Sequence, residues 1–272
     1  MLDLKPRAYF LDLDGTFLDL PKTENKVSED NINTARQLND QGIPVIISTG
    51  RRNSEFVLNL ANKINSPYII CQNGGLIVDK HNNILKKSEI KRDTALKVIE
   101  ILKKEKMFFM INSLPVIYGA STKVFMAKPW TKKMEIKKYD EIPQISDVTK
   151  ILTFGKLSTI AIKKLKNRLE SYFFNLKFHV VSKGWSIEIN DMNATKGIAN
   201  SYICQLLNID PKKAVHFGDS GNDISVKSHV GAFVVMKNAP RNIKKHGDMI
   251  AYSYKHGGVA KTIKNLFITK NN

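Results

Sequence analysis

The chain has 272 residues, of which 42% are hydrophobic, so it can bury a substantial core in one large domain or two smaller ones. It has no run of eighteen apolar residues and no secretory-signal pattern near its N-terminus, so we expect a cytoplasmic protein that does not associate with a membrane. The two cysteines, Cys71 and Cys204, lie in apolar segments without metal-ligand spacing, which argues against a disulfide framework or a thiolate metal site.

The chain is strongly basic, with 43 Lys and Arg against 25 Asp and Glu and a net charge of +18. Residues 86–187 alone contain 22 Lys and Arg against 9 Asp and Glu, so most of the excess lies in the middle of the chain. This charge has two interpretations: a lysine-rich composition spread over solvated surfaces, or attraction to an anionic partner. No zinc-finger, RNA-recognition or helix-turn-helix signature is present, so we expect no specific nucleic-acid partner, and an anionic partner would then be a small phosphorylated molecule. A monomer is the default expectation.

The beginning of the chain alternates between apolar strand-like segments and amphipathic helical segments. Strands are predicted at residues 8–13, 43–49 and 68–71, and helices at residues 28–42 and 52–65. In the first helix Ile32, Ala35 and Leu38 share one face, with Ser28 as the N-cap and Gly42 at the end. Because the strands are apolar throughout, the pattern indicates a parallel sheet with both faces covered by helices.

The pattern changes in the middle of the chain and then returns. A hairpin is predicted at residues 75–87, with its turn at Asn82–Asn83. It is followed by a lysine-rich helix at 93–106, strands at 108–111 and 116–120, a polar stretch at 128–149, a strand at 150–154, a helix at 158–173 and a strand at 178–181. Further on, helices are predicted at 194–207, 222–227 and 257–267, and strands at 214–219 and 231–236. We therefore predict an α/β fold: a doubly wound, mostly parallel core formed by residues 1–85 and 188–272, with an α+β domain inserted at residues 86–187.

Acidic side chains follow two of the predicted core strands. Asp12 and Asp14 leave the first strand on the same side, and Asp219 and Asp223 follow a strand near the C-terminus. Because ligands of parallel sheets bind beyond the carboxyl ends of the strands, these carboxylates are expected to converge. Two such charges about 4 Å apart repel by roughly 4 kcal/mol at an effective dielectric constant near 20, so the cluster needs a cation or shared protons. Oxygen ligands of this kind suit Mg²⁺.

Six short motifs occur in a specific order. They are Asp12-Leu13-Asp14-Gly15-Thr16, Ser48-Thr49-Gly50-Arg51, Asn73-Gly74-Gly75, Lys196-Gly197, Gly218-Asp219 with Asn222-Asp223, and Met236-Lys237-Asn238-Ala239. This set resembles the haloacid dehalogenase-like hydrolase superfamily, and in particular its Cof-type phosphatases of class IIB. The resemblance implies a Rossmann-like core with an inserted C2-type cap that acts as a substrate-selecting lid.

The resemblance also implies roles for individual residues. Asp12 would be the nucleophile that forms an aspartyl-phosphate, Asp14 the general acid and base, and Thr49 and Lys196 the groups that stabilise the transferring phosphoryl group. The implied Mg²⁺ ligands are Asp12, the backbone carbonyl of Asp14, Asp219, and Asn222 and Asp223 as further or alternative ligands. The implied substrate-binding residues are Thr16, Gly50, Arg51, Asn73 and Gly74. By position alone, a solvated surface lysine is the better-supported interpretation of Lys196. Thr49 could cap the following helix, and the Gly50–Arg51 and Asn73–Gly74 pairs are equally turn residues.

These observations favour a Mg²⁺-dependent phosphatase of a sugar phosphate, a phosphorylated cofactor or a nucleotide. Two alternatives stay open: a phosphomutase or phosphotransferase on the same fold, and a non-catalytic basic module that binds phosphorylated ligands or RNA. Specificity is expected in loops of the inserted domain, at residues 112–135 and 182–186. His216, inside a predicted strand, is interpreted as a core residue.

Overall fold

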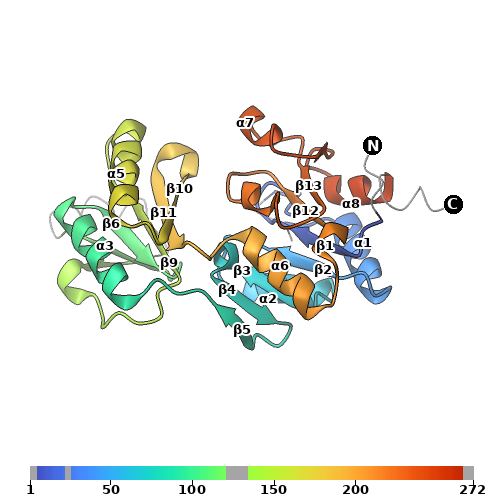
Figure 1. Cartoon of the computed structure of the whole chain (residues 1–272), viewed down its shortest axis with the longest axis horizontal. Coiled ribbons are helices and arrows are strands. Elements are labelled where there is room, and N and C mark those ends of the chain that lie inside the picture. The colour runs from blue at the N-terminus through green and yellow to red at the C-terminus, as the bar shows by residue number, and fades with distance from the viewer. Residues whose placement is uncertain (1–4, 22–25, 121–133, 266–272) are drawn as a thin grey trace. The chain divides into compact units, whose positions relative to one another are not determined.

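The computed structural model describes residues 5–21, 26–120 and 134–265, and the chain forms two compact units (Figure 1). Unit 1 comprises Met1–Lys87 and Thr195–Asn272, and unit 2 comprises Ser88–Ala194. The first border lies close to the one expected from the sequence, whereas the second moves from residue 187 to residue 194. The reason is a strand at Ser186–Asp191, which pairs with two strands of unit 2.

Unit 1 contains an eight-stranded sheet in the order β14-β13-β12-β1-β2-β3-β4-β5. Its strands are β1 (Ala8–Leu11), β2 (Val45–Ser48), β3 (Tyr68–Cys71), β4 (Leu76–Asp79), β5 (Ile84–Lys87), β12 (Ala214–Gly218), β13 (Ala232–Val235) and β14 (Met249–Ile250). The strands from β14 to β3 run parallel, and the β3–β4 and β4–β5 pairs at one edge are antiparallel. The middle pair of the six parallel strands is β12 and β1, so the carboxyl ends of these two strands lie side by side.

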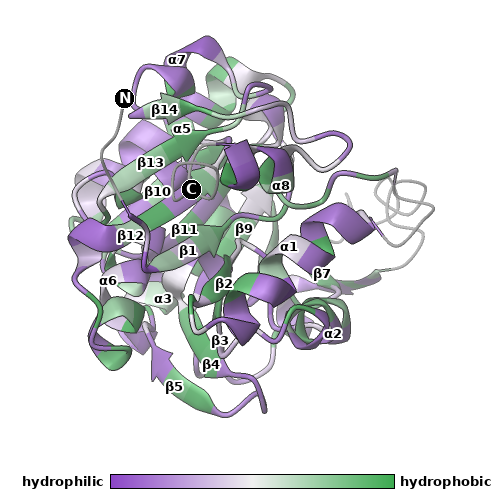
Figure 2. Cartoon of the chain, turned by 90° about the vertical axis from the view of Figure 1, so that its right-hand side faces the viewer, coloured by the Kyte–Doolittle hydropathy of each residue, from purple (hydrophilic) through white to green (hydrophobic). Residues whose placement is uncertain are grey.

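Helices cover both faces of this sheet, which confirms the predicted fold class. The helices are α1 (Glu29–Asp40), α2 (Glu55–Lys63), α6 (Lys196–Leu206), α7 (Arg241–Lys244) and α8 (Gly258–Ile263). Tyr9 and Leu11 of β1 pack with α1, α2 and α8, whereas Ala8 and Phe10 pack with α6 on the other side. Figure 2 shows the resulting contrast between the hydrophobic strands β3 and β4 and the mainly hydrophilic α1.

Unit 2 is an α+β unit with its own core. Its six-stranded sheet has the order β10-β11-β9-β6-β7-β8 and is antiparallel except for the β7–β8 pair. The elements are α3 (Arg92–Lys104), β6 (Phe108–Ile111), β7 (Val116–Gly119), β8 (Glu135–Lys138), β9 (Lys150–Phe154), α5 (Thr159–Tyr172), β10 (Leu176–Val181) and β11 (Ser186–Asp191). Val98 and Leu102 of α3 and Leu165 of α5 share one hydrophobic cluster with Phe109 and Ile187 of the sheet.

Several elements differ from the sequence-based prediction. Strand β11 was missed although Ile187 and Ile189 alternate with polar residues, and β8, β14 and α7 were not predicted. The predicted helix at 222–227 is a short 3₁₀ turn, Asp223–Val226. Residues 121–133, which include the start of the expected polar stretch and about half of the first specificity loop, lie outside the described residues.

Within the described ranges, no helix is both long enough and apolar enough to cross a membrane.

Candidate active site

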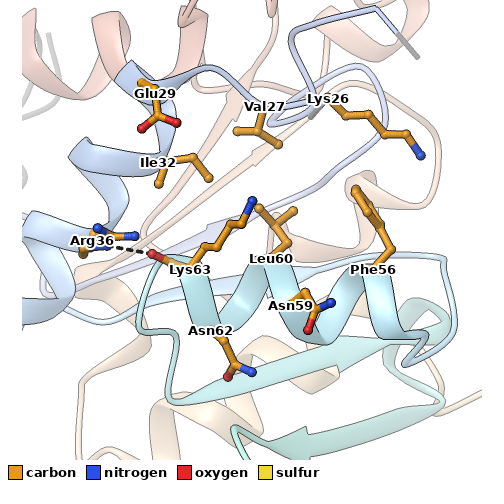
Figure 3. Close-up of a pocket in the computed structure, with 10 residues that line it drawn as sticks. All are labelled: Lys26, Val27, Glu29, Ile32, Arg36, Phe56, Asn59, Leu60, Asn62 and Lys63. Carbon is orange, nitrogen blue, oxygen red and sulfur yellow. Dashed lines mark hydrogen bonds between the residues drawn. The ribbon is translucent and has the colours of Figure 1, made fainter. Parts of the chain in front are cut away.

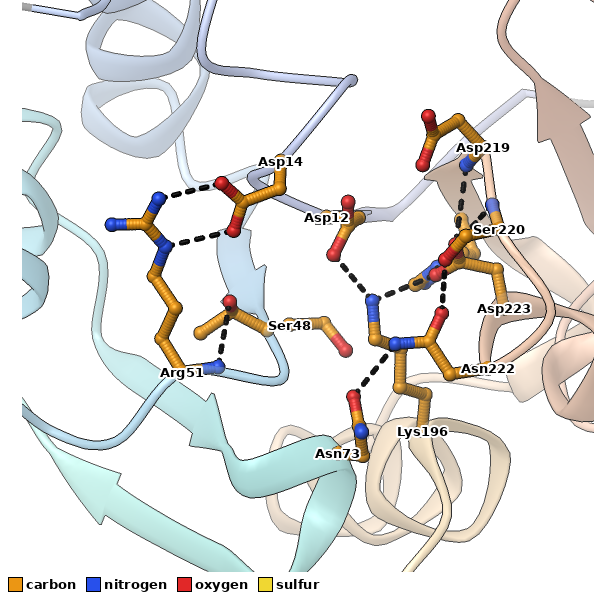
Figure 4. A network of polar contacts seen from close by, with 12 residues as sticks. Asp12, Asp14, Ser48, Arg51, Asn73, Lys196, Asp219, Ser220, Asn222 and Asp223 are labelled. Carbon is orange, nitrogen blue, oxygen red and sulfur yellow. Dashed lines mark hydrogen bonds and ion pairs between the residues drawn. The ribbon is translucent and has the colours of Figure 1, made fainter. Parts of the chain in front are cut away.

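Three carboxylates meet at the carboxyl end of the central strands of unit 1. Asp12 directly follows β1, and Asp219 directly follows β12, whose Phe217 lies opposite Leu11 in the parallel register. Asp223 begins the 3₁₀ turn that comes next. One oxygen from each of the three carboxylates lies within 4.8 Å of the others (Figure 4). The predicted convergence of Asp12, Asp219 and Asp223 is therefore present in the structure.

Gly15 allows the loop after β1 to approach this group closely. Its φ of +81° lies in the left-handed region, and a Cβ atom at this position would stand 2.2 Å from Oδ2 of Asp219. The amide of Asn238 fixes the same contact, because its Nδ2 donates to the carbonyl oxygen of Gly15 at 2.8 Å and to Oδ2 of Asp219 at 3.2 Å. No side chain other than hydrogen fits at position 15 without displacing Asp219.

Lys196 supplies a fully buried ammonium between two of the carboxylates. It is the first residue of α6, whose N-cap Thr195 accepts a hydrogen bond from the backbone of Ile198. Its Nζ lies 2.5 Å from Oδ1 of Asp12 and 2.7 Å from Oδ1 of Asp223. These contacts exclude the interpretation of Lys196 as a solvated surface lysine.

Behind Asp223 lies a buried polar network that the sequence analysis missed. Nε2 of His216 lies 2.9 Å from Oδ1 of Asp223, and Nδ1 of His216 lies 3.1 Å from the amide nitrogen of Asn200. The hydroxyl of Ser48 donates to the amide oxygen of Asn200 at 3.4 Å. His216 is indeed in the core, as expected, but it also orients Asp223. The sequence signal for this network was a single polar residue, His216, within the otherwise apolar strand β12.

Burial and charge give the four central groups different proton affinities. Burial raises the pKa of Asp12 to about 7 although the Lys196 ammonium opposes the shift, and burial together with repulsion from Asp223 raises that of Asp219 to about 6. Burial would also raise the pKa of Asp223, but Lys196 and the His216 donor hold it well below its ordinary range. Although burial disfavours the charged form of Lys196, Asp12 and Asp223 raise its pKa further, so it stays protonated.

This donor set fits a divalent cation. Three carboxylates and one ammonium leave an uncompensated negative charge, which a bound cation would neutralise. Asp12 and Asp219 are the residues best placed to hold such an ion. Both oxygens of Asp223 are already bonded, Oδ1 to Lys196 and His216 and Oδ2 to the backbone N–H groups of Asp219 and Ser220. Asp223 therefore positions Lys196 and the loop after β12.

The side chain of Asp14 lies apart from this group and pairs with Arg51. Nε of Arg51 donates to Oδ2 at 2.7 Å and Nη2 donates to Oδ1 at 2.5 Å, a bidentate ion pair in which the Asp14 side chain is 61% exposed (Figure 4). Arg51 in turn stands over the ring of Phe56. The proposed participation of the Asp14 backbone carbonyl in metal binding stays a prediction.

The remaining predicted residues connect the loops around the carboxylates. The hydroxyl of Thr49 accepts from the backbone N–H of Arg51 at 3.1 Å, and the N-cap of the following helix α2 is Ser54, so Thr49 does not cap that helix. Oδ1 of Asn73 accepts from Nδ2 of Asn222 at 2.8 Å, and Oδ1 of Asn222 accepts from the hydroxyl of Ser220. Asn222 thus links the loop after β12 to Asn73, and its assignment as a metal ligand stays a prediction.

Three predicted substrate-binding residues have packing roles in the structure. A Cβ atom on Gly74 would stand 2.4 Å from the carbonyl oxygen of Thr195, so this glycine lets its loop contact the start of α6. A Cβ atom on Gly50 would stand 3.0 Å from Oδ1 of Asn73. Thr16 is fully buried, and among the described residues its hydroxyl has no hydrogen-bond partner. Their contact with substrate stays a prediction.

Gly197 provides a test of how tightly α6 is seated. A Cβ atom there would stand 2.2 Å from the carbonyl oxygen of Ser225 and 2.5 Å from the ring of His229. Alanine improves helix propensity by about 1 kcal/mol, but a forced backbone shift costs about 1–3 kcal/mol. We expect Gly197→Ala to lower the midpoint of thermal unfolding, measured by circular dichroism. Gly221→Ala is the matched control, because nothing lies within 4 Å of its added Cβ, and an equal midpoint for the two variants would contradict the close seating.

A separate cavity of about 710 Å³ lies between α1 and α2 (Figure 3). Its lining residues are Lys26, Val27, Glu29, Ile32, Arg36, Phe56, Asn59, Leu60, Asn62 and Lys63. None of the predicted site residues lines it, and the converging carboxylates are elsewhere. Size alone therefore does not identify the reactive site of this chain.

Comparison with known proteins gives a consistent picture. A family model described as haloacid dehalogenase-like hydrolase matches residues 9–263. A phosphatase of Bacillus subtilis is 25% identical over 94% of this chain and 98% of its own length. A 5-amino-6-(5-phospho-D-ribitylamino)uracil phosphatase of the same organism is 27% identical, over 97% of this chain and 96% of its own. A solved sugar phosphatase of subclass IIB superposes with a TM-score of 0.78 at 17% identity, over 96% of this chain and 99% of that one.

Proposed function

This chain belongs to the haloacid dehalogenase-like hydrolase family, and from that premise we propose that it is a Mg²⁺-dependent phosphatase of small phosphorylated metabolites. The sequence-based recognition of the family is confirmed, and the fold is that of a subclass IIB member, as the Cof-type resemblance implied. The observation that carries the proposal is the placement of Asp12, which lies buried at the end of the central strand, against Lys196 and beside Asp219.

Asp12 is the proposed nucleophile. Lys196 donates to Oδ1 of Asp12, which fixes the carboxylate and leaves the second oxygen to attack phosphorus. The bond from this oxygen to phosphorus forms while the bond from phosphorus to the leaving oxygen breaks, and an aspartyl-phosphate results. The Lys196 ammonium stands where negative charge accumulates on the transferring group and therefore stabilises the transition state.

Asp14 is the proposed general acid and base. It gives a proton to the leaving oxygen and then takes one from the water that attacks the aspartyl-phosphate, so that phosphate is released and Asp12 is regenerated. In this structure Arg51 holds the Asp14 carboxylate at both oxygens. We expect the substrate phosphate to compete for the Arg51 guanidinium, which would release Asp14 toward the leaving group.

Asp12 and Asp219 are the proposed ligands of the divalent ion. When bound, the ion would screen the negative charge that the Asp12 carboxylate and the phosphate bring together. The chain itself then has to keep both carboxylates in place, which Asn238 does for Asp219 and Lys196 does for Asp12.

The substrate class rests on the similar proteins. One is named for a phosphorylated ribitylaminouracil and another is a sugar phosphatase, and both names describe small phosphorylated molecules. We assign substrate selection to unit 2, as its position in the chain between the Asn73-Gly74-Gly75 and Lys196-Gly197 motifs suggests. Screening of phosphorylated metabolites by kcat/KM would identify the preferred compound.

Removal of divalent metal tests the proposal. We expect purified protein treated with a chelator to lose turnover of p-nitrophenyl phosphate, and added Mg²⁺ to restore it, because the carboxylate group lacks a compensating charge without the ion. Release of free phosphate, measured with the same protein, separates a phosphatase from a phosphotransferase or mutase. Turnover that the chelator leaves unchanged would contradict the proposed site, and the absence of any Mg²⁺-stimulated turnover would favour a non-catalytic binding module.

A further inference from the structure

Helix α3 of unit 2 buries one face and exposes a stripe along the other. Its apolar residues Ala95, Val98, Ile99 and Leu102 pack into the core of unit 2. On the opposite side, the exposed residues Asp93, Leu96, Lys97, Glu100 and Lys104 lie on one helix face, with Leu96 and Lys97 adjacent in sequence and the others three or four positions apart. At this spacing the five side chains form one continuous strip of helix surface.

Apolar side chains accompany this strip. Leu96 is 39% exposed, and beyond the end of α5, Tyr172 and Phe174 are 63% and 85% exposed. Between α3 and the end of α5 lies an open hollow of about 610 Å³, lined by Leu96, Ile101, Tyr172 and Phe173 together with charged residues of the strip. Figure 1 shows both helices on the same side of the sheet. Large apolar groups that a fold leaves in contact with water often mark a site of association.

The charges of the strip are arranged symmetrically. Along α3 they read negative, positive, negative and positive at residues 93, 97, 100 and 104. The pairs 93 with 104, 97 with 100, and 96 with 101 all have the same midpoint, between Val98 and Ile99. A second α3 laid antiparallel on the first would therefore bring Asp93 opposite Lys104, Lys97 opposite Glu100, and Leu96 opposite Ile101, and each pairing would occur twice.

We propose that unit 2 binds a second copy of this chain through an antiparallel α3–α3 contact with two-fold symmetry. Residues 88–194 contain 20 Lys and Arg against 11 Asp and Glu, so most of this surface would repel a copy of itself, whereas the strip carries two charges of each sign. An acidic partner would meet Asp93 and Glu100, and a basic partner would meet Lys97 and Lys104. Only a partner with the same alternation satisfies all four charges.

One existing contact is compatible with this arrangement. Lys103 lies 2.9 Å from Oε1 of Glu100 within the same helix, and both side chains are partly exposed. Such an ion pair at the surface contributes less than about 1 kcal/mol to stability, and a carboxylate can accept hydrogen bonds from two cationic donors. Glu100 can therefore accept from Lys97 of the second copy. The inference does not depend on the proposed catalytic function.

Charge reversal with sedimentation velocity tests the contact. We expect the unmodified protein to shift from monomer to dimer with rising concentration at low salt, and the dimer to weaken at high salt. Lys97→Glu alone and Glu100→Lys alone each place like charges together twice, so the dissociation constant should rise by about a hundredfold or more. The double variant restores opposite charges and should dimerise again. Lys212→Glu, at an exposed position in unit 1, is the matched control and should leave the dimer unchanged.

Mixing the two single variants gives the sharpest result. Each is expected to be monomeric alone, while an equal mixture should form a heterodimer, because positions 97 and 100 are then both acidic in α3 of one chain and both basic in α3 of the other. Thermal unfolding and p-nitrophenyl phosphate turnover of each variant, both expected to be unchanged, report correct folding. A monomeric unmodified protein at every concentration, or folded single variants that do not associate when mixed, would overturn the proposal.

Discussion

Replacing Asp12 with asparagine should lower kcat by roughly four orders of magnitude or more, because removal of a nucleophile eliminates the covalent route altogether. The substitution keeps the size of the side chain but removes the attacking oxygen's charge. The measurement is the steady-state release of phosphate from p-nitrophenyl phosphate in saturating Mg²⁺. A variant with more than a tenth of the original kcat would exclude Asp12 as the nucleophile.

The same variant should keep its fold. Asp12 is one of three carboxylates that repel one another, and burial raises its pKa, so the charged form is disfavoured there. Asparagine removes that charge, and Lys196 retains Asp223 as its partner. We therefore expect an unchanged or higher unfolding midpoint. Asp30→Asn, the same chemical change at an exposed position of α1, should leave both kcat and the midpoint unchanged.

Replacing Lys196 with methionine should damage both stability and activity. The ammonium lies fully buried between Asp12 and Asp223, so its removal leaves two carboxylates without their cation. Loss of one partner from a buried ion pair costs about 3–5 kcal/mol, which exceeds the packing that methionine retains. We expect a clear fall in the free energy of unfolding, measured with urea, and a kcat below about a hundredth of the original value.

A second substitution separates the two effects. Asp223→Asn in the Lys196→Met background removes one of the unpaired charges, and its amide oxygen can still accept from His216. Stability should therefore recover in part, while activity should not, because the cation at the phosphoryl group is still missing. Lys261→Met, at an exposed position of α8, is the control and should change the free energy of unfolding by less than about 0.5 kcal/mol. Unaltered stability of Lys196→Met would show that the pairing with Asp12 and Asp223 is not formed in solution.

The core of the fold was predictable because its signals are local. Strands β1, β2 and β3 are apolar throughout, and α1 has its N-cap at Ser28 and its end before Gly42 as the sequence indicates. Strand β11 was missed because every second residue in it is polar. Ser186, Glu188 and Asn190 are nevertheless buried in the structure. The pairing of β11 with β9 and β10 could not be read from the sequence, and this error displaced the predicted end of the inserted domain.

The candidate site was predictable in its composition but not in its contacts. Parallel strands bring Asp12 and Asp219 together, and this follows from the topology alone. The contact of Lys196 with Asp12 spans 184 positions, so only the ordered set of motifs could suggest it. The orientation of Asp14 toward Arg51 and the His216–Asn200 network depend on side-chain packing in three dimensions, which the spacing of residues does not specify.

The central claim is that Asp12 transiently carries the phosphoryl group. The most direct measurement is a single-turnover reaction with Mg²⁺ and an excess of enzyme, stopped with acid and analysed by mass spectrometry of the peptide that contains Asp12. The account predicts a phosphate adduct on Asp12 that forms and decays at rates sufficient for turnover. An active enzyme whose adduct is on another residue, or that forms none while water attacks the substrate directly, would contradict it.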